Sequence, residues 1–111
     1  MTSEQERRVG MNESIFREVN ERIESAADAF GLRDQPLNLI CECGDSTCTQ
    51  QISMTRPEYE SLRSDPTHFA VFPGHEIVDV EDLVERRKGY DVVRKNEGEP
   101  AKVARETDPR S

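Results

Sequence analysis

The sequence has no tryptophan, and only four phenylalanines and two tyrosines stand among its 111 residues. Leu, Ile, Val and Phe together make up about one fifth of the chain, close to the level below which a highly charged sequence stays disordered. So small a core leaves little net stability, and a bound metal or cross-link would add to it. Because the apolar residues lie mostly between Ile15 and Val93, we expect one core and one domain.

Basic residues are also scarce. The chain has 15 Lys and Arg against 23 Asp and Glu, which gives a net charge of -8. Nucleic acid is therefore not an expected partner, since proteins bind it largely by neutralising phosphates with Lys and Arg. The one basic run, residues 86–88, lies among acidic residues, and we interpret it as the solvated end of a hairpin.

No long hydrophobic run is present, either as a signal peptide at the N-terminus or as a membrane span later in the chain. We therefore expect a cytoplasmic protein that does not enter a membrane. Three cysteines cannot all pair within one chain, and a reducing compartment would keep them as thiols. Metal binding is then the leading use for them.

A helix is the clearest local pattern. Apolar residues recur at spacings of three, four and one, Asn12 can cap the start, and Gly31 suits a left-handed end. We predict a flexible segment over residues 1–11 and then a helix that turns its apolar stripe toward the core. The stripe is Ile15, Phe16, Val19, Ile23, Ala26, Ala27 and Phe30, and the predicted solvent face is Glu13, Arg17, Glu21, Arg22, Glu24 and Asp28.

The remaining patterns favour short hairpins, and hence an α+β fold: a long N-terminal helix packed on a small antiparallel sheet of hairpins, with a zinc-knuckle-like cysteine tip. We predict one α+β domain over residues 12–96, then a short helix and a polar tail over 97–111. The predicted elements are strands over 37–43 and 49–54, a helix from the capping box of Thr55 and Glu58 to Leu62, a strand over 69–72, a hairpin over 77–94 and a helix over 101–106 that Pro100 opens.

Cys41, Cys43 and Cys48 form a cluster with the sequence Cys-Glu-Cys-Gly-Asp-Ser-Thr-Cys. Alternation along a strand places the first two thiols on one side, and the Gly-Asp turn brings the third back to them. Three thiolates at one point predict a zinc site, because zinc takes sulfur and nitrogen ligands in a tetrahedron. Reduced thiols packed in the core and a redox pair are the alternatives.

The fourth ligand must come from elsewhere in the chain. We predict His75, because the turn after the strand over 69–72 can direct an imidazole at the hairpin tip. His68 is the second choice, and Asp45 or Glu42 could also complete the set. A shell of three thiolates and an imidazole is full, which is typical of a structural rather than a catalytic zinc.

An enzymatic role has no positive support. The deaminase, metalloprotease, nucleotide-binding and nucleophile-elbow motifs are all missing. Only a site of three thiolates and a water, beside Glu42 or Glu76, could activate that water for hydrolysis.

Several segments carry a resemblance to a known group: residues 12–23, the cysteine motif at 41–48, residues 57–59, Pro-Gly-His-Glu at 73–76 and Thr-Asp-Pro-Arg at 107–110. Over about nine-tenths of its length, the chain resembles a family of short, uncharacterised bacterial proteins that are commonest in actinomycete genomes. The resemblance implies no activity, and it favours His75 as a matched position.

Two hypotheses follow. The first is a zinc-stabilised interaction module that binds an unknown protein partner, with a basic surface, through the sheet opposite the long helix or through the edge of the strand over 69–72. The second is a thiol and zinc regulator that loses its metal when the cysteines are oxidised.

Overall fold

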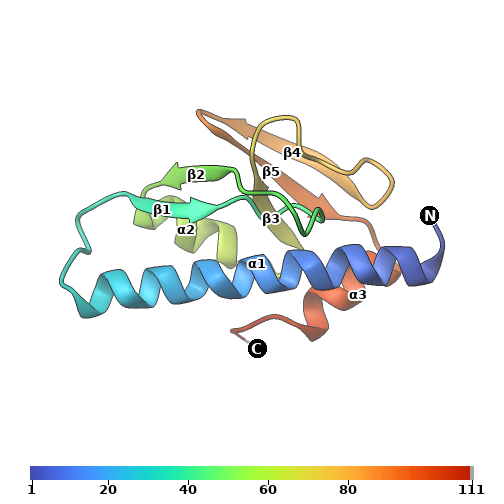
Figure 1. The fold of residues 1–111 in the computed structure, drawn as a ribbon, viewed down its shortest axis with the longest axis horizontal. Helices are drawn as coiled ribbons and strands as arrows, with labels where there is room; N and C mark the ends of the chain where they lie inside the picture. Colours follow the sequence, from blue (N-terminus) through green and yellow to red (C-terminus); the bar gives the residue numbers. More distant parts are fainter. Residues whose placement is uncertain (111) are drawn as a thin grey trace.

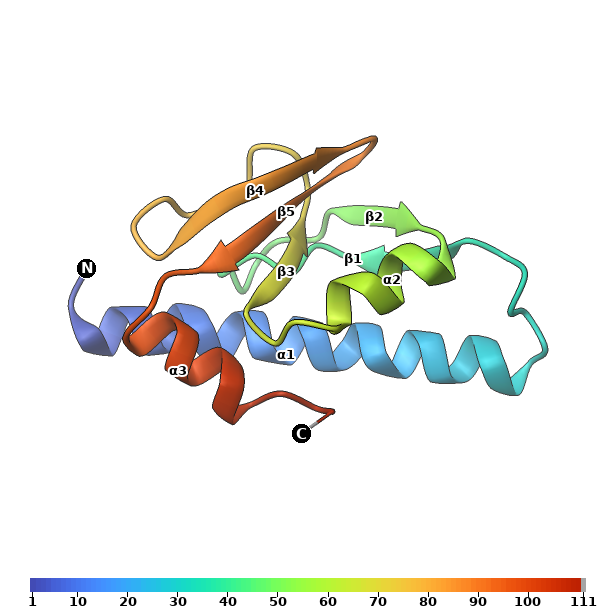
Figure 2. The ribbon, with the colours of Figure 1, turned by 180° about the vertical axis from the view of Figure 1, so that it is seen from behind.

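The longest element is helix α1, which spans the length of the molecule in the computed structural model, whose described residues are 1–110 (Figure 1). Two antiparallel sheets lie along one side of α1, and helix α3 packs beside its N-terminal half (Figure 2). The first sheet pairs β1 with β2, and the second has the order β3-β5-β4. The predicted α+β fold, a long helix on hairpins, is confirmed. The elements are α1 (Ser3–Ala29), β1 (Leu37–Ile40), β2 (Gln51–Met54), α2 (Arg56–Arg63), β3 (His68–Val71), β4 (Glu81–Arg87), β5 (Tyr90–Lys95) and α3 (Glu99–Glu106).

The start of α1 corrects the prediction of a flexible segment before Asn12. The helix begins at Ser3 because Thr2 and Gln5 form a capping box, in which each side chain accepts a hydrogen bond from the other's backbone N–H. Gly10 then lies so close to α3 that an added Cβ would be 2.9 Å from Val103 Cγ1. Asn12 is an interior residue whose side-chain amide donates to the Gly44 carbonyl at 3.0 Å.

The other local signals give the predicted elements with small shifts of boundary. Thr55 and Glu58 form the capping box of α2, Gly89 takes a φ of 90° in the turn between β4 and β5, and Pro100 stands in the first turn of α3. Strand β1 ends at Ile40, before the cysteines, although the Cys41 N–H still donates to the Gln50 carbonyl.

The buried face of α1 differs from the predicted one, although Ile23 and Ala27 of the predicted stripe are partly buried against the core. Ile15 and Val19 are exposed, and Phe30 keeps 80% of its surface in contact with solvent. The buried side consists of Gly10, Glu13, Arg17, Asn20 and Glu24. These residues also recur every three or four positions, so they form a continuous polar stripe along the helix.

Each buried polar residue of α1 has a partner in another element. Glu13 accepts a hydrogen bond from Lys95 Nζ at 2.6 Å, and the same ammonium group donates to Glu81 at 2.8 Å. Arg17 donates to the carbonyls of Pro66 and Ala104 at 2.8 and 3.0 Å, and its guanidinium lies over the Phe69 ring. Burial beside Glu81 raises the pKa of Glu13 well above its usual value.

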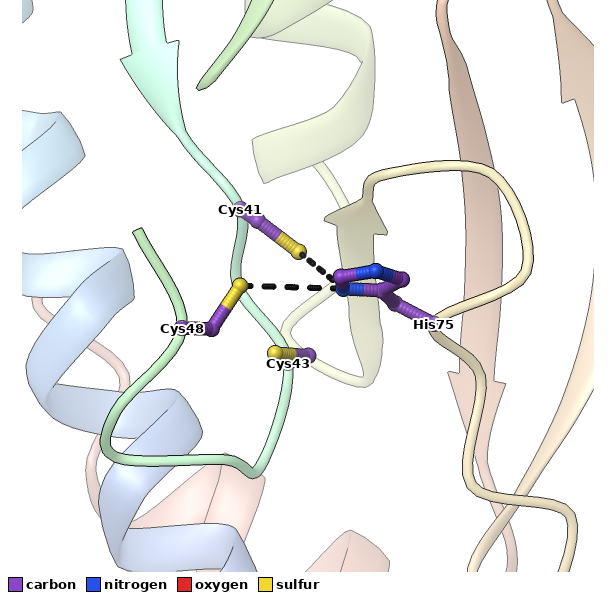
Figure 3. Close-up of side chains that lie close together, drawn as sticks. All are labelled: Cys41, Cys43, Cys48 and His75. Atoms are coloured by element: carbon purple, nitrogen blue, oxygen red, sulfur yellow. Dashed lines mark hydrogen bonds between the residues drawn. The ribbon is translucent and has the colours of Figure 1, made fainter. Parts of the chain in front are cut away.

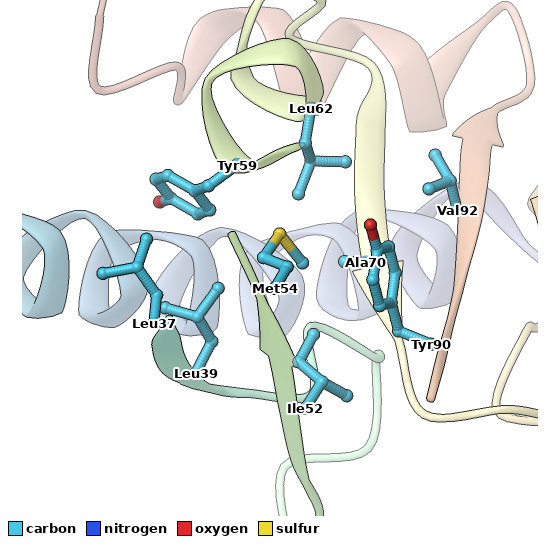
Figure 4. Packing of buried hydrophobic residues seen from close by; sticks show 9 residues of the cluster. All are labelled: Leu37, Leu39, Ile52, Met54, Tyr59, Leu62, Ala70, Tyr90 and Val92. Atoms are coloured by element: carbon cyan, nitrogen blue, oxygen red, sulfur yellow. The ribbon is translucent and has the colours of Figure 1, made fainter. Parts of the chain in front are cut away.

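The main apolar cluster lies between the sheets and α2 (Figure 4). From α1 it receives only partly buried residues, Ile23 and Ala27. Helix α1 therefore contributes no fully buried apolar side chain to this cluster. The cluster consists of Leu37, Leu39, Ile52, Met54, Tyr59, Leu62, Ala70, Tyr90 and Val92.

We expect Lys95→Met to lower the free energy of unfolding by about 3–5 kcal/mol, because it leaves two buried carboxylates without their cation. The loss should be largest above neutral pH and smaller in acid. Because the pKa of Glu13 is raised in the folded protein, folding takes up a proton. This uptake becomes less favourable as the pH rises, so stability falls in the same direction. Urea unfolding at several pH values measures this. Lys102→Met, at an exposed lysine with an i,i+4 partner, is the control, and an equal effect of both variants would contradict the account.

Candidate metal centre

The structure brings Cys41, Cys43, Cys48 and His75 together at one point (Figure 3). Their donor atoms, three Sγ and one imidazole nitrogen, all lie within 4.8 Å of one another. His75 Nδ1 is 3.7 Å from Cys41 Sγ and 3.6 Å from Cys48 Sγ. Zinc bonds of about 2.1–2.3 Å at tetrahedral angles give ligand-to-ligand edges of about 3.5–3.8 Å. The two distances from His75 Nδ1 match such edges, and the cluster as a whole is compatible with a metal-binding site.

The tip between β1 and β2 holds the three cysteines in place. Cys41 and Cys43 belong to the extended segment that follows β1, and both are buried. The Asp45 carboxylate accepts hydrogen bonds from the N–H and hydroxyl of Thr47, and the Cys48 N–H donates to the Asp45 carbonyl. Gly44 permits the close approach of this turn to α1, because a Cβ there would lie 2.5 Å from Val9 Cγ1.

His75 lies in the loop that follows β3. Its backbone N–H donates to the Phe72 carbonyl at 2.9 Å, and its ring packs against the Phe72 ring with centroids 5.2 Å apart. The Phe72 N–H in turn donates to Cys41 Sγ at 3.1 Å. One residue therefore supports both sides of the site, and it stabilises negative charge on the Cys41 sulfur.

The three thiols share their protons unevenly. A hydrogen bond from the Cys41 thiol lowers the pKa of Cys43 to about 5. The same hydrogen bond, together with burial, raises the pKa of Cys41. Burial also raises the pKa of Cys48. The low pKa favours the thiolate form of Cys43. A metal ion bound here would have to displace the protons of the other two thiols, so its binding would strengthen as the pH rises.

The alternative fourth ligands lie elsewhere or face away from the cluster. His68 pairs with Asp65 at 3.6 Å, and Asp45 is occupied within its own turn. Glu42 faces away from its two neighbouring cysteines and is fully buried. The three predicted cysteines and His75 are the residues that the fold brings together, while His68, Asp45 and Glu42 are not part of the group.

Glu42 instead accepts hydrogen bonds from three separate elements. Arg63 of α2 donates to both carboxylate oxygens, at 3.0 and 2.6 Å, and the Asn20 side chain of α1 donates at 2.7 Å. The N–H of Ala70 in β3 donates at 3.0 Å. Glu42 lies between Cys41 and Cys43 in the sequence. Its ion pair with Arg63 therefore fixes the backbone from which both thiols project.

The same segment covers the free edge of β3, which corrects the prediction that this edge binds a partner. The Glu42 N–H donates to the Ala70 carbonyl at 2.8 Å, next to the bond from the Ala70 N–H to the Glu42 carboxylate. With the bond from Phe72 to Cys41 Sγ, this edge of the sheet is occupied from within the chain.

Arg63 and Asn20 are the supporting residues that sequence reasoning missed. The alternation of side chains along an extended segment does show that Glu42 faces away from the thiols. No local sequence pattern, however, indicates that its partner is Arg63, 21 positions later. The Asn20 side chain also accepts a hydrogen bond from the Ile40 N–H and donates one to the Ile40 carbonyl, both at 2.9 Å. It thereby satisfies both backbone groups of this β1 residue, as a neighbouring strand would.

Comparison of the chain with models of known protein families, with curated proteins and with solved structures finds no match. The resemblance to short actinomycete proteins therefore stays a prediction. Within residues 1–110, no helix has both the length and the apolar character needed to cross a membrane.

We expect Glu42→Gln to lower the free energy of unfolding by about 3 kcal/mol, because Arg63 would stay buried without a full counter-charge. Loss of this support should also weaken metal binding by about 10–100-fold. Urea unfolding and competition with a zinc chelator measure the two effects. Glu97→Gln, which breaks the exposed pair with Arg105, should change neither quantity. A Glu42→Gln protein as stable as the parent would show that the buried pair is not needed.

Proposed function

We propose that Cys41, Cys43, Cys48 and His75 bind one zinc ion as a closed structural site, and that the domain it stabilises is a protein-interaction module. The observation that carries the metal assignment is the distance from His75 Nδ1 to the two sulfurs, 3.6 and 3.7 Å, which fits the edges of a zinc tetrahedron. Three sulfurs and one imidazole favour zinc over magnesium or calcium, which prefer oxygen.

A structural role suits this ligand set better than a catalytic one. Four protein donors fill a tetrahedron and leave no position for a water or a substrate. Glu42, one of the two carboxylates considered for activating a water, faces away and is held by Arg63. The zinc would instead tie the tip between β1 and β2 to the loop after β3, and so join the two sheets.

The interaction role is supported by apolar residues left in contact with solvent. Met11, Ile15 and Val19 follow one another at intervals of four residues on α1 and keep 39%, 56% and 38% of their surface exposed in a chain with a small core. Apolar residues that gather on a surface mark a site of association more often than scattered ones do. The net charge of -8 favours an unrelated partner with a basic surface.

One observation favours the second candidate function, a thiol-dependent regulator. Cys48 is partly exposed, whereas Cys41 and Cys43 are buried. An oxidant such as a peroxide would therefore reach Cys48 first, and a ligand lost there would release the zinc and loosen the tip. Fast zinc release by peroxide at low excess would support this role, and release only after unfolding would support the purely structural one.

The test is elemental analysis of protein purified without a histidine tag. We expect one equivalent of zinc in the parent chain, loss of zinc in Cys41→Ser, and weaker retention in His75→Ala. Chelation should unfold the parent, because in small domains the binding energy of a structural zinc contributes directly to folding.

His68→Ala is the matched control, since that imidazole belongs to the Asp65 pair and not to the cluster. It should keep its zinc. Parent protein that contains no metal and stays folded in chelator would contradict the zinc site. The three cysteines would then be core or redox residues.

A further inference from the structure

The solvent-exposed face of α1 combines an apolar centre with charged residues on either side. Met11 and Ile15 lie at the centre of this face, with 39% and 56% of their surface exposed. At about 100° per residue, Glu4, Arg8, Met11, Ile15, Glu18 and Arg22 all fall within an arc of about 80° on the helix. The buried residues of α1 are centred on roughly the opposite side. We name these six residues the α1 stripe.

The α1 stripe has the spacing of a helix-packing seam. Its positions follow one another at intervals of four, three, four, three and four residues, as in the contact line of two packed helices. The intervals read the same in both directions. An antiparallel copy can therefore place each position of the stripe opposite another position of the stripe.

The charges complement one another in that antiparallel pairing. With the two-fold axis level with residue 13, Glu4 faces Arg22 of the second copy and Arg8 faces its Glu18. Met11 then faces Ile15 across the axis. Each contact occurs twice, so the interface has an apolar centre flanked by four pairs of opposite charge.

Within one chain the same charges have only weak partners. Arg8 pairs with Glu4 at 3.6 Å, and Arg22 with Glu18 at 3.5 Å, on solvent-exposed side chains. Exposed pairs of this kind contribute little to stability, so exchanging them for contacts between chains costs little. Met11 and Ile15, in contrast, gain burial that they lack in the single chain.

We propose that the protein forms an antiparallel homodimer through the α1 stripe, in the register that pairs Met11 with Ile15. This goes beyond the proposed function, whose partner is an unrelated protein, and does not depend on the metal centre. The stripe and the cysteine cluster lie on different parts of the fold: the cluster belongs to the β1–β2 tip and the loop after β3, and the stripe belongs to the solvent side of α1.

The test is sedimentation of the full chain with its metal content measured on the same samples, at concentrations up to about 1 mM, which captures even a millimolar Kd. We expect the mass to rise from 12.7 kDa toward twice that value. Ile15→Glu should stay a monomer with unchanged helix content and zinc content. Val78→Glu changes an even more exposed apolar residue away from α1, at 74% against 56% for Ile15, and should dimerise like the parent.

A charge exchange tests the register. Arg8→Glu and Glu18→Arg should each weaken dimerisation by about tenfold, because each replaces two attractive pairs with two repulsive ones. The double variant restores both pairs between chains, although it places like charges four residues apart within each helix. It should dimerise within about threefold of the parent.

Three results would overturn the proposal: a parent that stays monomeric throughout, a dimer that persists in Ile15→Glu, or a double variant as weak as the single ones. The metal content separates this failure from that of the zinc site. A monomeric zinc protein contradicts only the dimer, and a dimeric protein without zinc contradicts only the metal centre.

Discussion

The buried ion pair between Glu42 and Arg63 is the interaction on which the rest of the structure depends. It is the point where α1, α2, β3 and the cysteine segment meet, through Asn20, Arg63 and the N–H of Ala70. A buried pair of this kind does not stabilise a fold more than apolar packing would, but losing one partner is costly. Its consequence here is geometric, because the backbone that it holds carries two of the proposed metal ligands, Cys41 and Cys43. The proposed metal site lies on the other side of the same segment and would join it to the loop after β3.

Features with a local cause could be predicted from the sequence. The capping box that begins α2, the glycine turn between β4 and β5 and the return of Cys48 toward Cys41 all depend on residues within a few positions of one another. The choice of His75 over His68 also came from local reasoning, since the turn after β3 directs one imidazole at the tip while the other precedes the strand. For such features, the backbone preferences of a few residues are enough.

The orientation of α1 could not be predicted, because hydrophobic periodicity assumes that the core side of a helix is apolar. Here the core side carries Glu13, Arg17 and Asn20, and each is satisfied by a partner distant in sequence: Lys95 for Glu13, the Ala104 carbonyl for Arg17 and the Ile40 backbone for Asn20. Both stripes have helical spacing, and only the distant partners decide between them. The start of α1 was missed for a simpler reason, because a Thr and Gln capping box lies ahead of the apolar run that drew attention to Asn12.

X-ray absorption at the zinc edge, on protein purified without added metal, tests the central claim most directly. A closed site made by Cys41, Cys43, Cys48 and His75 requires about three sulfur neighbours at about 2.3 Å and one nitrogen at about 2.0 Å. A spectrum with these shells, lost on Cys41→Ser substitution, is the expected result. Zinc bound mainly by oxygen and nitrogen, or no zinc in folded protein, would contradict the account and leave the four residues as a packed cluster of thiols and an imidazole.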